Sequence, residues 1–269
     1  MNLCLRQAED LKESFKRREN ADENKVDAYI NLDKFTIIIP DPLFPAEPTS
    51  YIPTLTGIKF HSMDDRVRVV RGHVGSGKTT MECAEIIFRT VRMPACKDGV
   101  RRTRCAVIRN TYGDLIKTTL HTWKQWFNRL GQVRSVQSPS FSISHVFKAE
   151  VTEYGVTELR QCTLELLPIA LDTVIDVTKH LKSLEVTFAF LNELSELEPM
   201  VLDFFTGGRM PRYPRLQDFN EEQRKNDKIY WSGLFSDTNP PEEDSWIYQL
   251  FEVKKPPEYI MLVQPPAVI

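Results

Sequence analysis

The stretch Gly72-His73-Val74-Gly75-Ser76-Gly77-Lys78-Thr79 decides how the rest of the chain is interpreted. It fits the pattern G-x-x-x-x-G-K-[ST], in which glycines let the backbone turn so that successive N–H groups converge on a phosphate. In such a loop Lys78 reaches the outer phosphate oxygens, and the Thr79 hydroxyl binds Mg²⁺. The sequence therefore predicts a site for ATP and Mg²⁺, with the nucleotide held by Gly72, His73, Val74, Gly75, Ser76, Gly77, Lys78, Thr79 and Thr80.

The residues on either side place this loop between a strand and a helix. An apolar run from Val67 to Val70 precedes the loop, and a helical pattern from Thr80 to Val91 follows it and stops before Pro94. The apolar stripe of that helix consists of Met81, Ala84, Phe88 and Val91. Strand, loop and helix are the setting that a phosphate-binding loop requires.

Beyond the loop, short apolar runs alternate with helical stretches, which is typical of a mostly parallel central sheet flanked by helices. The runs Val146 to Val151 and Glu158 to Leu167, separated by Tyr154-Gly155, predict an antiparallel hairpin attached to one side. The predicted fold is an α/β P-loop NTPase of the additional-strand, catalytic-glutamate type. Its predicted strands are Val67 to Val70, Cys105 to Ile108, Thr163 to Ile169, Val186 to Leu191, Tyr230 to Phe235 and Tyr259 to Val263.

The first 55 residues show a different pattern. Cys4, Ala8, Leu11 and Phe15 recur at the spacing of one helical stripe, which predicts an amphipathic helix that packs on the body or on a partner. The strand-like run Phe35 to Ile39 leads into five prolines, which predict an extended connector: Pro40, Pro42, Pro45, Pro48 and Pro53. We expect residues 1–55 to form this helix and proline-rich connector, and residues 56–269 to form the P-loop ATPase domain.

The bulk composition is that of an ordinary globular chain. Of the 269 residues, 41% are hydrophobic and 27% are charged, and the formal net charge is −2. The five cysteines include no C-x-x-C pair, so we expect core packing rather than a disulfide framework or a zinc site. No apolar stretch approaches the roughly 20 residues that cross a bilayer, so no membrane partner is expected.

A second acidic element is expected at the end of a neighbouring strand. The uncharged run Val186 to Leu191 leads directly into Asn192 and Glu193, and ligands of open α/β sheets bind at the carboxyl ends of the strands. We predict that Glu193 is the general base that polarises the attacking water. The alternatives Glu196 and Glu198 lie beyond the strand and are typical of solvated acids.

Asn192 stands where the usual pattern has Asp. The side chain carries no charge but keeps a carbonyl that can accept from a water on the metal, so Thr79 and Asn192 are the predicted metal residues. A third strand ends in Asp237, Thr238 and Asn239, short polar side chains suited to sensing the γ-phosphate. Taken alone, this cluster before Pro240 is also a turn sequence.

With these motifs in this order, the chain resembles the ATPase half of the large subunit of tailed-bacteriophage terminases over nearly its whole length. The most discriminating blocks are Arg109 to Trp123 and Lys182 to Glu193. The other matching segments are Val70 to Thr79, Gly208-Arg209, Arg212 to Pro214 and Asp237 to Pro241. An Asn before the catalytic Glu is similar to a variant found in one branch of these proteins.

The resemblance implies an ATPase domain that self-associates into a ring on the procapsid portal in the host cytoplasm. Its implied partners are the portal protein, the small terminase subunit and double-stranded viral DNA, which it translocates while hydrolysing ATP. Glu193 then corresponds to the catalytic carboxylate, and Asp237, Thr238 and Asn239 to the element that couples hydrolysis to movement. The relatives carry a nuclease domain after the ATPase, and this chain ends before it, so no nuclease activity is expected of these 269 residues.

Two further sets of basic residues follow from this interpretation. An arginine finger that neutralises the γ-phosphate, in cis or from a neighbouring subunit, is expected among Arg71, Arg109, Arg209 and Arg212, each of which also fits a surface or phosphate-binding role. From Arg89 to Arg134 there are eleven Lys and Arg but two acids, which suits contact with a duplex backbone. The expected DNA-binding residues are Lys97, Arg101, Arg102 and Arg104, unless this loop is merely solvated.

Two other functions remain open on the sequence. A different P-loop DNA-dependent ATPase, such as a helicase-like enzyme, would need single-strand channels and further arginine motifs that we do not find. A nucleotide-binding assembly module would bind ATP at a subunit interface with little turnover, and the uncharged Asn192 favours it. Measured hydrolysis separates the module from the motor.

Overall fold

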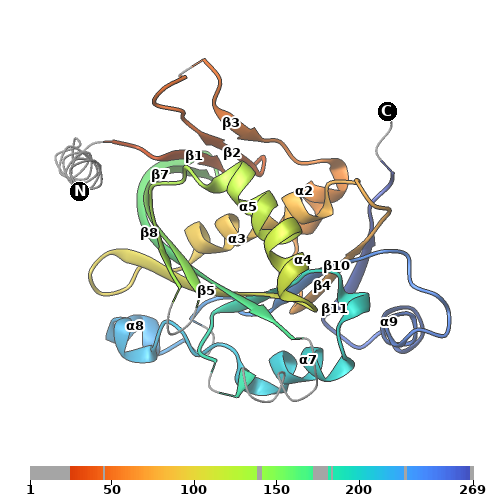
Figure 1. Ribbon diagram of the computed structural model, residues 1–269. Coiled ribbons are helices and arrows are strands. Elements are labelled where there is room, and N and C mark those ends of the chain that lie inside the picture. Colours follow the sequence, from red (N-terminus) through yellow and green to blue (C-terminus); the bar gives the residue numbers. More distant parts are fainter. Residues whose placement is uncertain are drawn as a thin grey trace, which may run out of the picture.

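The computed structural model describes residues 25–44, 46–137, 141–171, 181–182, 184–226 and 229–266. The helix expected over Cys4 to Phe15 lies outside these residues. Figure 1 shows one curved sheet crossing the molecule, with helices on both of its faces. Within the described part of the chain, no helix is long and apolar enough to cross a membrane.

Five parallel strands form the half of the sheet that carries the phosphate loop. In spatial order they are β11 (Tyr259–Val263), β4 (Val67–Arg71), β10 (Leu234–Thr238), β9 (Phe188–Leu191) and β5 (Val100–Arg109). β4 leads into the phosphate loop, and β10 is inserted between it and β9, the strand that precedes Glu193. One additional strand between these two defines the predicted class, so the predicted fold is confirmed.

The other half of the sheet is built on the predicted hairpin. β7 (Ser142–Glu153) and β8 (Val156–Ala170) pair antiparallel across a turn in which Tyr154 and Gly155 have φ values of 52° and 73°. Two positive φ values match the right-handed twist of a tight hairpin. β8 also pairs in parallel with the whole of β5, so the hairpin is longer than predicted and continues the central sheet.

The segment expected as a connector adds further strands to this sheet. β1 (Ala28–Asn31) pairs in parallel with β7, and β2 (Thr36–Ile39) and β3 (Thr49–Tyr51) follow antiparallel, while β6 (Gln132–Val136) pairs with β7. Pro40, Pro42 and Pro48 lie between these strands rather than within them, because proline cannot donate a hydrogen bond to the ladder.

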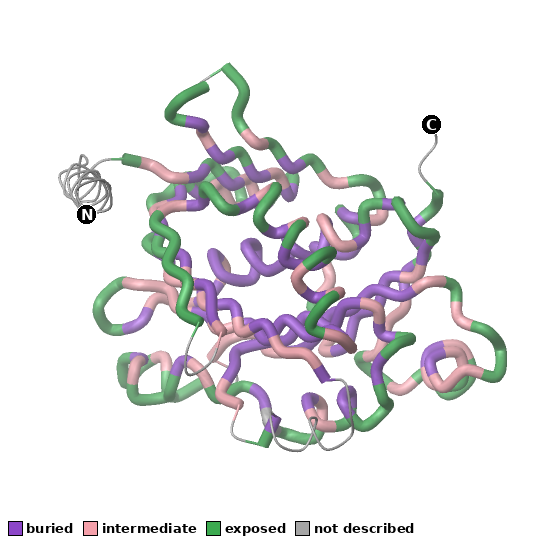
Figure 2. The backbone as a smooth tube through the Cα atoms, viewed as in Figure 1, coloured by how far each residue is buried: buried purple, intermediate pink, exposed green. Residues whose placement is uncertain are grey.

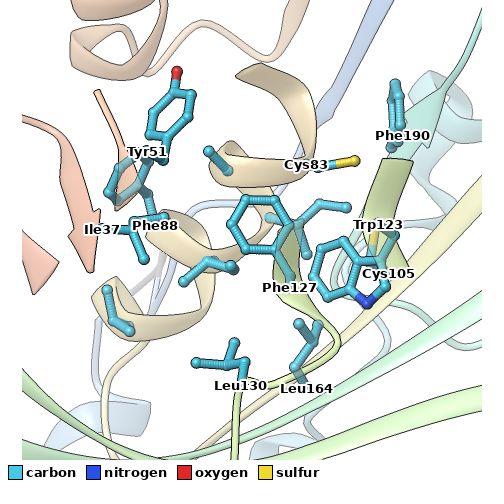
Figure 3. Close-up of a cluster of buried hydrophobic side chains, with 14 of the residues drawn as sticks. Ile37, Tyr51, Cys83, Phe88, Cys105, Trp123, Phe127, Leu130, Leu164 and Phe190 are labelled. Atoms are coloured by element: carbon cyan, nitrogen blue, oxygen red, sulfur yellow. The ribbon is translucent and has the colours of Figure 1, made fainter. Parts of the chain in front are cut away.

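One face of the sheet is covered by α2 (Leu55–Ser62), α3 (Lys78–Arg92) and α5 (Leu120–Phe127). In Figure 3, Phe88 of α3 and Trp123 and Phe127 of α5 lie among Cys105 and Leu164 of the strands. Trp123 and Phe127 are almost fully buried. Four cysteines, Cys83, Cys96, Cys105 and Cys162, are free and buried, which fits their expected role in packing.

The opposite face is covered by shorter helices. A second apolar cluster joins β4, β9 and β10 to residues of α7, η3, α9 and η5. Figure 2 shows buried residues running along the strands, with exposed residues on the outer sides of these helices. The remaining bounds are α4 (Tyr112–Asp114), η1 (Leu115–Thr119), η2 (Leu194–Glu196), α7 (Pro199–Phe204), η3 (Phe205–Arg209), η4 (Leu216–Asp218), α8 (Glu221–Arg224), α9 (Trp246–Tyr248) and η5 (Gln249–Lys254).

The largest difference from the predicted strands concerns β10. The sequence predicted a strand from Tyr230 to Phe235 with a polar cluster after it, but the strand runs from Leu234 to Thr238 and contains Asp237. All five of its residues are buried, and Asp237 pairs with Val70 of β4. Polar side chains therefore lie inside the sheet, and neighbouring groups supply hydrogen bonds to two of them, Ser236 and Asp237.

Candidate nucleotide site

The phosphate loop joins β4 to α3 in the predicted way. Gly75 and Gly77 have φ values of 79° and 81°, a left-handed conformation that side chains with a Cβ disfavour. Gly77 caps α3, so the loop N–H groups and the positive end of the helix dipole lie at the same place. The Lys78 ammonium donates to the carbonyls of Gly72 and His73 at 2.7 and 3.1 Å, which holds it over the loop.

Asp237 is the charged group around which the site is assembled. Its Oδ2 accepts from the Thr79 hydroxyl at 3.3 Å. Its Oδ1 accepts from Asn192 Nδ2 at 2.8 Å and from the backbone N–H of Glu193 at 2.7 Å. The phosphate loop, the predicted base and the end of β10 therefore meet at one carboxylate, which is 1% exposed.

Glu193 has the backbone and the environment of a functional carboxylate. Its φ of 55° and ψ of 69° are left-handed, a conformation that costs a non-glycine residue about 1–2 kcal/mol. Burial, followed by the negative charge of Asp237, raises the pKa of Glu193 above its ordinary value. A raised pKa improves a carboxylate as a proton acceptor at neutral pH. The rivals Glu196 and Glu198 are exposed.

Asn192 is held from three directions. Its Oδ1 accepts from Arg109 Nη1 at 2.6 Å and from the Thr119 hydroxyl at 2.5 Å, while its Nδ2 donates to Asp237. The oxygen expected to face a metal water is thus engaged by two donors. In the structure the acid next to Thr79 is Asp237, which the sequence had assigned to coupling.

Several polar atoms around this site have no hydrogen-bond partner within the described residues. They are Ser76 Oγ, Glu193 Oε2, Thr238 Oγ1 and Asn239 Oδ1. Buried polar atoms are rarely left unpaired in proteins, so their gathering at one edge fits a polar ligand. Thr238 and Asn239 were the predicted coupling residues, and the structure brings both to the end of β10.

Glu82 is a further acid that the sequence analysis missed. It lies on α3 one turn after Lys78, is fully buried, and neither carboxyl oxygen has a partner within the described residues. Burial, with the nearby charge of Asp237 second, raises the pKa of Glu82 well above its ordinary range. The uncharged form of Glu82 is therefore favoured. Burial also raises the pKa of Asp237, against which the hydrogen bonds from Glu193 N–H and Asn192 and the charge of Lys78 stabilise its ionised form.

The structure separates the four candidate finger arginines. Arg71, at the end of β4, pairs with Glu252 at 2.9 Å, and both side chains are about 30% exposed. Arg109, at the end of β5, donates a hydrogen bond from its guanidinium group to Asn192 Oδ1. Arg212 lies at the amino ends of the strands, opposite the phosphate loop. Its backbone N–H donates to the Val186 carbonyl just before β9. The side chain of Arg209 lies outside the described part of the structure.

A cavity also lies at the amino ends of the strands. Its volume is about 1050 Å³, and Arg66, Arg212 and Glu258 are among its lining residues. Arg66 and Glu258 immediately precede β4 and β11, so the cavity opens at the amino ends of the strands. Ligands of open α/β sheets bind at the carboxyl ends of the strands, so geometry and chemistry favour the phosphate loop over this cavity as the nucleotide site.

The predicted DNA-binding residues do not form a loop, because Arg101, Arg102 and Arg104 lie on β5. Their charges are largely neutralised by acids of the same chain. Arg101 pairs with Glu158 at 3.3 Å, and Arg104 pairs with Glu165 at 2.7 Å. Arg102 pairs with Asp98 at 2.5 Å. Lys97 is exposed and has no ion pair within the described residues. Glu158 and Glu165 are distant in sequence from these arginines, whereas Asp98 is close. In the folded chain Arg101, Arg102 and Arg104 therefore do not form a patch of unpaired positive charge.

Comparison with solved structures identifies the fold. The chain aligns with the large terminase of a thermophilic bacteriophage with a TM-score of 0.54 and 11% identity, over 78% of this chain and 45% of that one. The Thermus phage P74-26 large terminase ATPase domain aligns with a TM-score of 0.47 and 14% identity, over 79% and 81% of the two chains. The HK97 bacteriophage large terminase aligns with a TM-score of 0.46 and 10% identity, over 79% and 39%.

The fold comparison rests on the first of these structures, the terminase of the thermophilic phage, of which this chain spans less than half the length. No family model matches the sequence, and a comparison with curated proteins finds no match either. The likeness is therefore one of architecture. In this chain that architecture is a mostly parallel sheet with one strand inserted beside the phosphate-loop strand. The chain has the fold of a bacteriophage large terminase, the family that its sequence motifs resemble.

Proposed function

We propose that the chain is the ATP-hydrolysing motor domain of a bacteriophage large terminase, which moves double-stranded DNA into a procapsid. The observation that carries this proposal is the meeting of Lys78, Thr79 and Glu193 at one edge of the sheet, around Asp237. A cation for the phosphates, a hydroxyl for the metal and a carboxylate with a raised pKa are the parts that ATP hydrolysis needs.

Each residue has a separate part in the proposed reaction. The loop N–H groups and Lys78 bind and orient the phosphates, and the Thr79 hydroxyl with the acid beside it holds the metal side of the site. Glu193 accepts a proton from the attacking water. Mg²⁺ bound with the nucleotide would neutralise charge on the phosphates, and the unpartnered Ser76 and Thr238 hydroxyls fit such a polar ligand.

The partners follow from the terminase likeness. We infer that the chain acts at the portal vertex in the host cytoplasm, with the portal protein, the small terminase subunit and viral DNA, as a ring of several copies. Arg71 is the finger candidate for its own site, because its partly exposed pair with Glu252 is weak enough to open. Arg212 lies at the amino ends of the strands, away from the phosphate loop of its own chain, so as a finger it would act at the site of a neighbouring subunit.

The best surface for the DNA backbone is the outer side of η1 and α5, rather than the loop around Lys97. Residues 115–149 contain five Lys and Arg and no acid. Within them Lys117, His121 and Lys124 are exposed at four- and three-residue intervals, opposite buried Trp123. Exposed lysines in a stretch without acids bind phosphates without reading bases, which a translocating motor requires.

This surface is joined directly to the nucleotide site. Thr119, two residues after Lys117, donates its hydroxyl to Asn192, which lies beside the proposed base. η1 is a π-helical turn at the start of this helix, a local geometry that recurs at functional sites. A shift of the helix against the DNA would therefore act on Asn192, which is the kind of connection that a motor needs.

The second candidate is a nucleotide-binding assembly module, favoured by the uncharged Asn192. Steady-state ATP hydrolysis at high protein concentration, with Mg²⁺ and duplex DNA, separates the two. The motor proposal expects turnover that duplex DNA increases and that Lys78→Ala abolishes together with nucleotide binding. Tight ATP binding without turnover in the presence of DNA would support the module instead.

A further inference from the structure

The position of Asp237 raises a question that the proposed function leaves open, namely which residue carries the charge on the metal side of the site. Asn192 occupies the strand-end position just before Glu193 and has no charge. Asp237 is fully buried on the neighbouring strand, and Thr79, Asn192 and Glu193 all donate hydrogen bonds to its carboxyl group.

The sheet register fixes this arrangement. β10 lies between β4 and β9, and Ser236 pairs with Leu191 while Asp237 pairs with Val70. Asp237 is therefore one residue past the paired part of β9, at the level of Asn192 and at the base of the phosphate loop. A side chain at this position reaches both the loop and Asn192, as the distances of 3.3 and 2.8 Å show.

We propose that Asp237 is the acid that orients the hydrated Mg²⁺ beside Thr79, and that Asn192 is the hydrogen-bond donor that positions Asp237. The inference rests on the proposed nucleotide function. It names Asp237 as the residue on which the Mg²⁺ dependence of nucleotide binding rests. The sequence pattern places this acid at position 192, at the end of β9. In the structure the acid is Asp237, on the neighbouring strand β10.

The same geometry explains the asparagine. A carboxylate at position 192 would place two acidic oxygens at about the 2.8 Å that now separates Asn192 Nδ2 from Asp237 Oδ1, and like charges so close cannot both ionise. An amide has a donor for Asp237 at one end and an acceptor for Arg109 and Thr119 at the other. Asn192 and Asp237 thus form a matched pair across two strands.

Two variants test this assignment: Asp237→Asn, and the exchange Asn192→Asp with Asp237→Asn. The exchange keeps one acid and one amide in the site and returns the charge to β9. The dissociation constant of a fluorescent ADP analogue is measured in Mg²⁺ and in EDTA, and Mn²⁺ binding is measured by electron paramagnetic resonance in the presence of ADP.

For Asp237→Asn, we expect the affinity gain that Mg²⁺ gives to fall by about tenfold or more, the size typical of losing a group that orients a metal's ligands. Affinity in EDTA should stay within a few-fold of the unsubstituted chain, which also shows that the variant is folded. The exchanged variant should recover most of the Mg²⁺ response and of the Mn²⁺ binding.

A Mg²⁺ response in Asp237→Asn equal to that of the unsubstituted chain would overturn the assignment. If Asp237→Asn binds no nucleotide in EDTA, the exchanged variant decides: recovery of the response supports the pair, and no recovery overturns it. Failure of the proposed function itself looks different, because the unsubstituted chain would then bind no nucleotide in either condition.

Discussion

At the scale of single residues, Glu193 combines a chemical role with a backbone conformation that its side chain disfavours. The left-handed φ of 55° is rare for a residue with a Cβ, and strained backbone is typical of functional sites. Its surroundings hold it there, since its backbone N–H is fixed by Asp237 at 2.7 Å. Stability therefore favours glycine at position 193, whereas the proposed function requires the glutamate carboxylate.

This conflict gives a matched pair of variants, Glu193→Ala and Glu193→Gly. Both remove the carboxylate, but only the glycine relieves the left-handed strain, so we expect Glu193→Gly to be more stable than Glu193→Ala by about 1 kcal/mol. The free energy of unfolding in urea measures this difference. Equal stabilities, or a more stable alanine variant, would mean that residue 193 is not left-handed in solution.

A second residue-scale prediction concerns His145, which is buried and neutral. Its Nε2 accepts from Trp123 Nε1 at 3.0 Å, so its Nδ1–H must be the group that donates to the Leu130 carbonyl at 3.0 Å. Burial lowers the pKa of His145 to about 4 from its ordinary 6.5. Protonation would add a second N–H facing the indole N–H, which leaves a donor without an acceptor.

The sign of the pH effect follows from this lowered pKa. Between pH 6.5 and 4 the unfolded chain binds a proton that the native state does not, so stability falls as pH decreases, by about 3 kcal/mol over the whole window. Unfolding in urea at pH 7 and pH 5 should show a loss about 2 kcal/mol greater in the unsubstituted chain than in His145→Gln. Equal losses in the two proteins would contradict this account.

At the scale of elements, α3 is tied to β4 and α2 by a buried ion cluster. Glu85 of α3 accepts from Arg68 at 2.7 Å and from Arg89 at 2.6 Å, and it lies 2.6 Å from His61. The two guanidinium groups hold the pKa of Glu85 well below its usual range despite burial. This cluster positions the helix that begins in the phosphate loop.

Removing that carboxylate should be costly. Glu85→Gln leaves Arg68 and Arg89 without their shared buried partner, and we expect a loss of about 3–5 kcal/mol in the free energy of unfolding. The matched control is Glu165→Gln, which breaks the partly exposed pair with Arg104 and should cost about 1 kcal/mol or less. Similar losses in the two variants, measured in urea, would show that the buried cluster has no special role.

The sequence predicted the elements of the nucleotide half well. β11 was predicted residue for residue, and the strand before the phosphate loop differs by one residue, because both are short apolar runs between clear breaks. β10 was misplaced because Ser236, Asp237 and Thr238 are polar yet buried. Periodicity cannot identify such a strand, since the partners of its side chains come from other strands.

The same limit applies to the site. Lys78, Thr79 and Glu193 were proposed from local motifs, because each stands at a fixed distance from a recognisable strand or loop, and the structure places all three at the same ends of the strands. The contact of Asp237 with Asn192 depends on the register between β10 and β9, over 45 positions of sequence separation. The neutral Glu82 and the Thr119 link are also visible only once α3 and η1 pack beside the strand ends.

At the scale of the whole molecule, folding redistributes charge in a way that the sequence does not show. Arg101, Arg102 and Arg104 of β5 are paired, whereas the exposed side of η1 and α5 keeps Lys117 and Lys124 in a stretch without acids. A basic run in sequence is therefore a weaker guide to a DNA surface than the absence of acids around exposed cations.

This view predicts how duplex affinity depends on salt. The double variant Lys117→Ala with Lys124→Ala should bind duplex DNA more weakly. The magnitude of the negative slope of log K against log salt should fall by about 2, close to one unit per lost phosphate contact. Arg102→Ala, whose partner is Asp98, is the control and should leave the slope nearly unchanged. The opposite ranking of the two variants would assign the DNA surface to residues 97–104.

The central claim is that the edge formed by the phosphate loop and the end of β9 hydrolyses ATP with Glu193 as the base. The most direct measurement is steady-state ATP hydrolysis at high protein concentration with Mg²⁺, for the unsubstituted chain beside Glu193→Ala, with ATP binding measured for both. The account predicts that both bind ATP and that turnover falls by about 10²–10⁴-fold in the variant. Turnover by Glu193→Ala at the rate of the unsubstituted chain would contradict it.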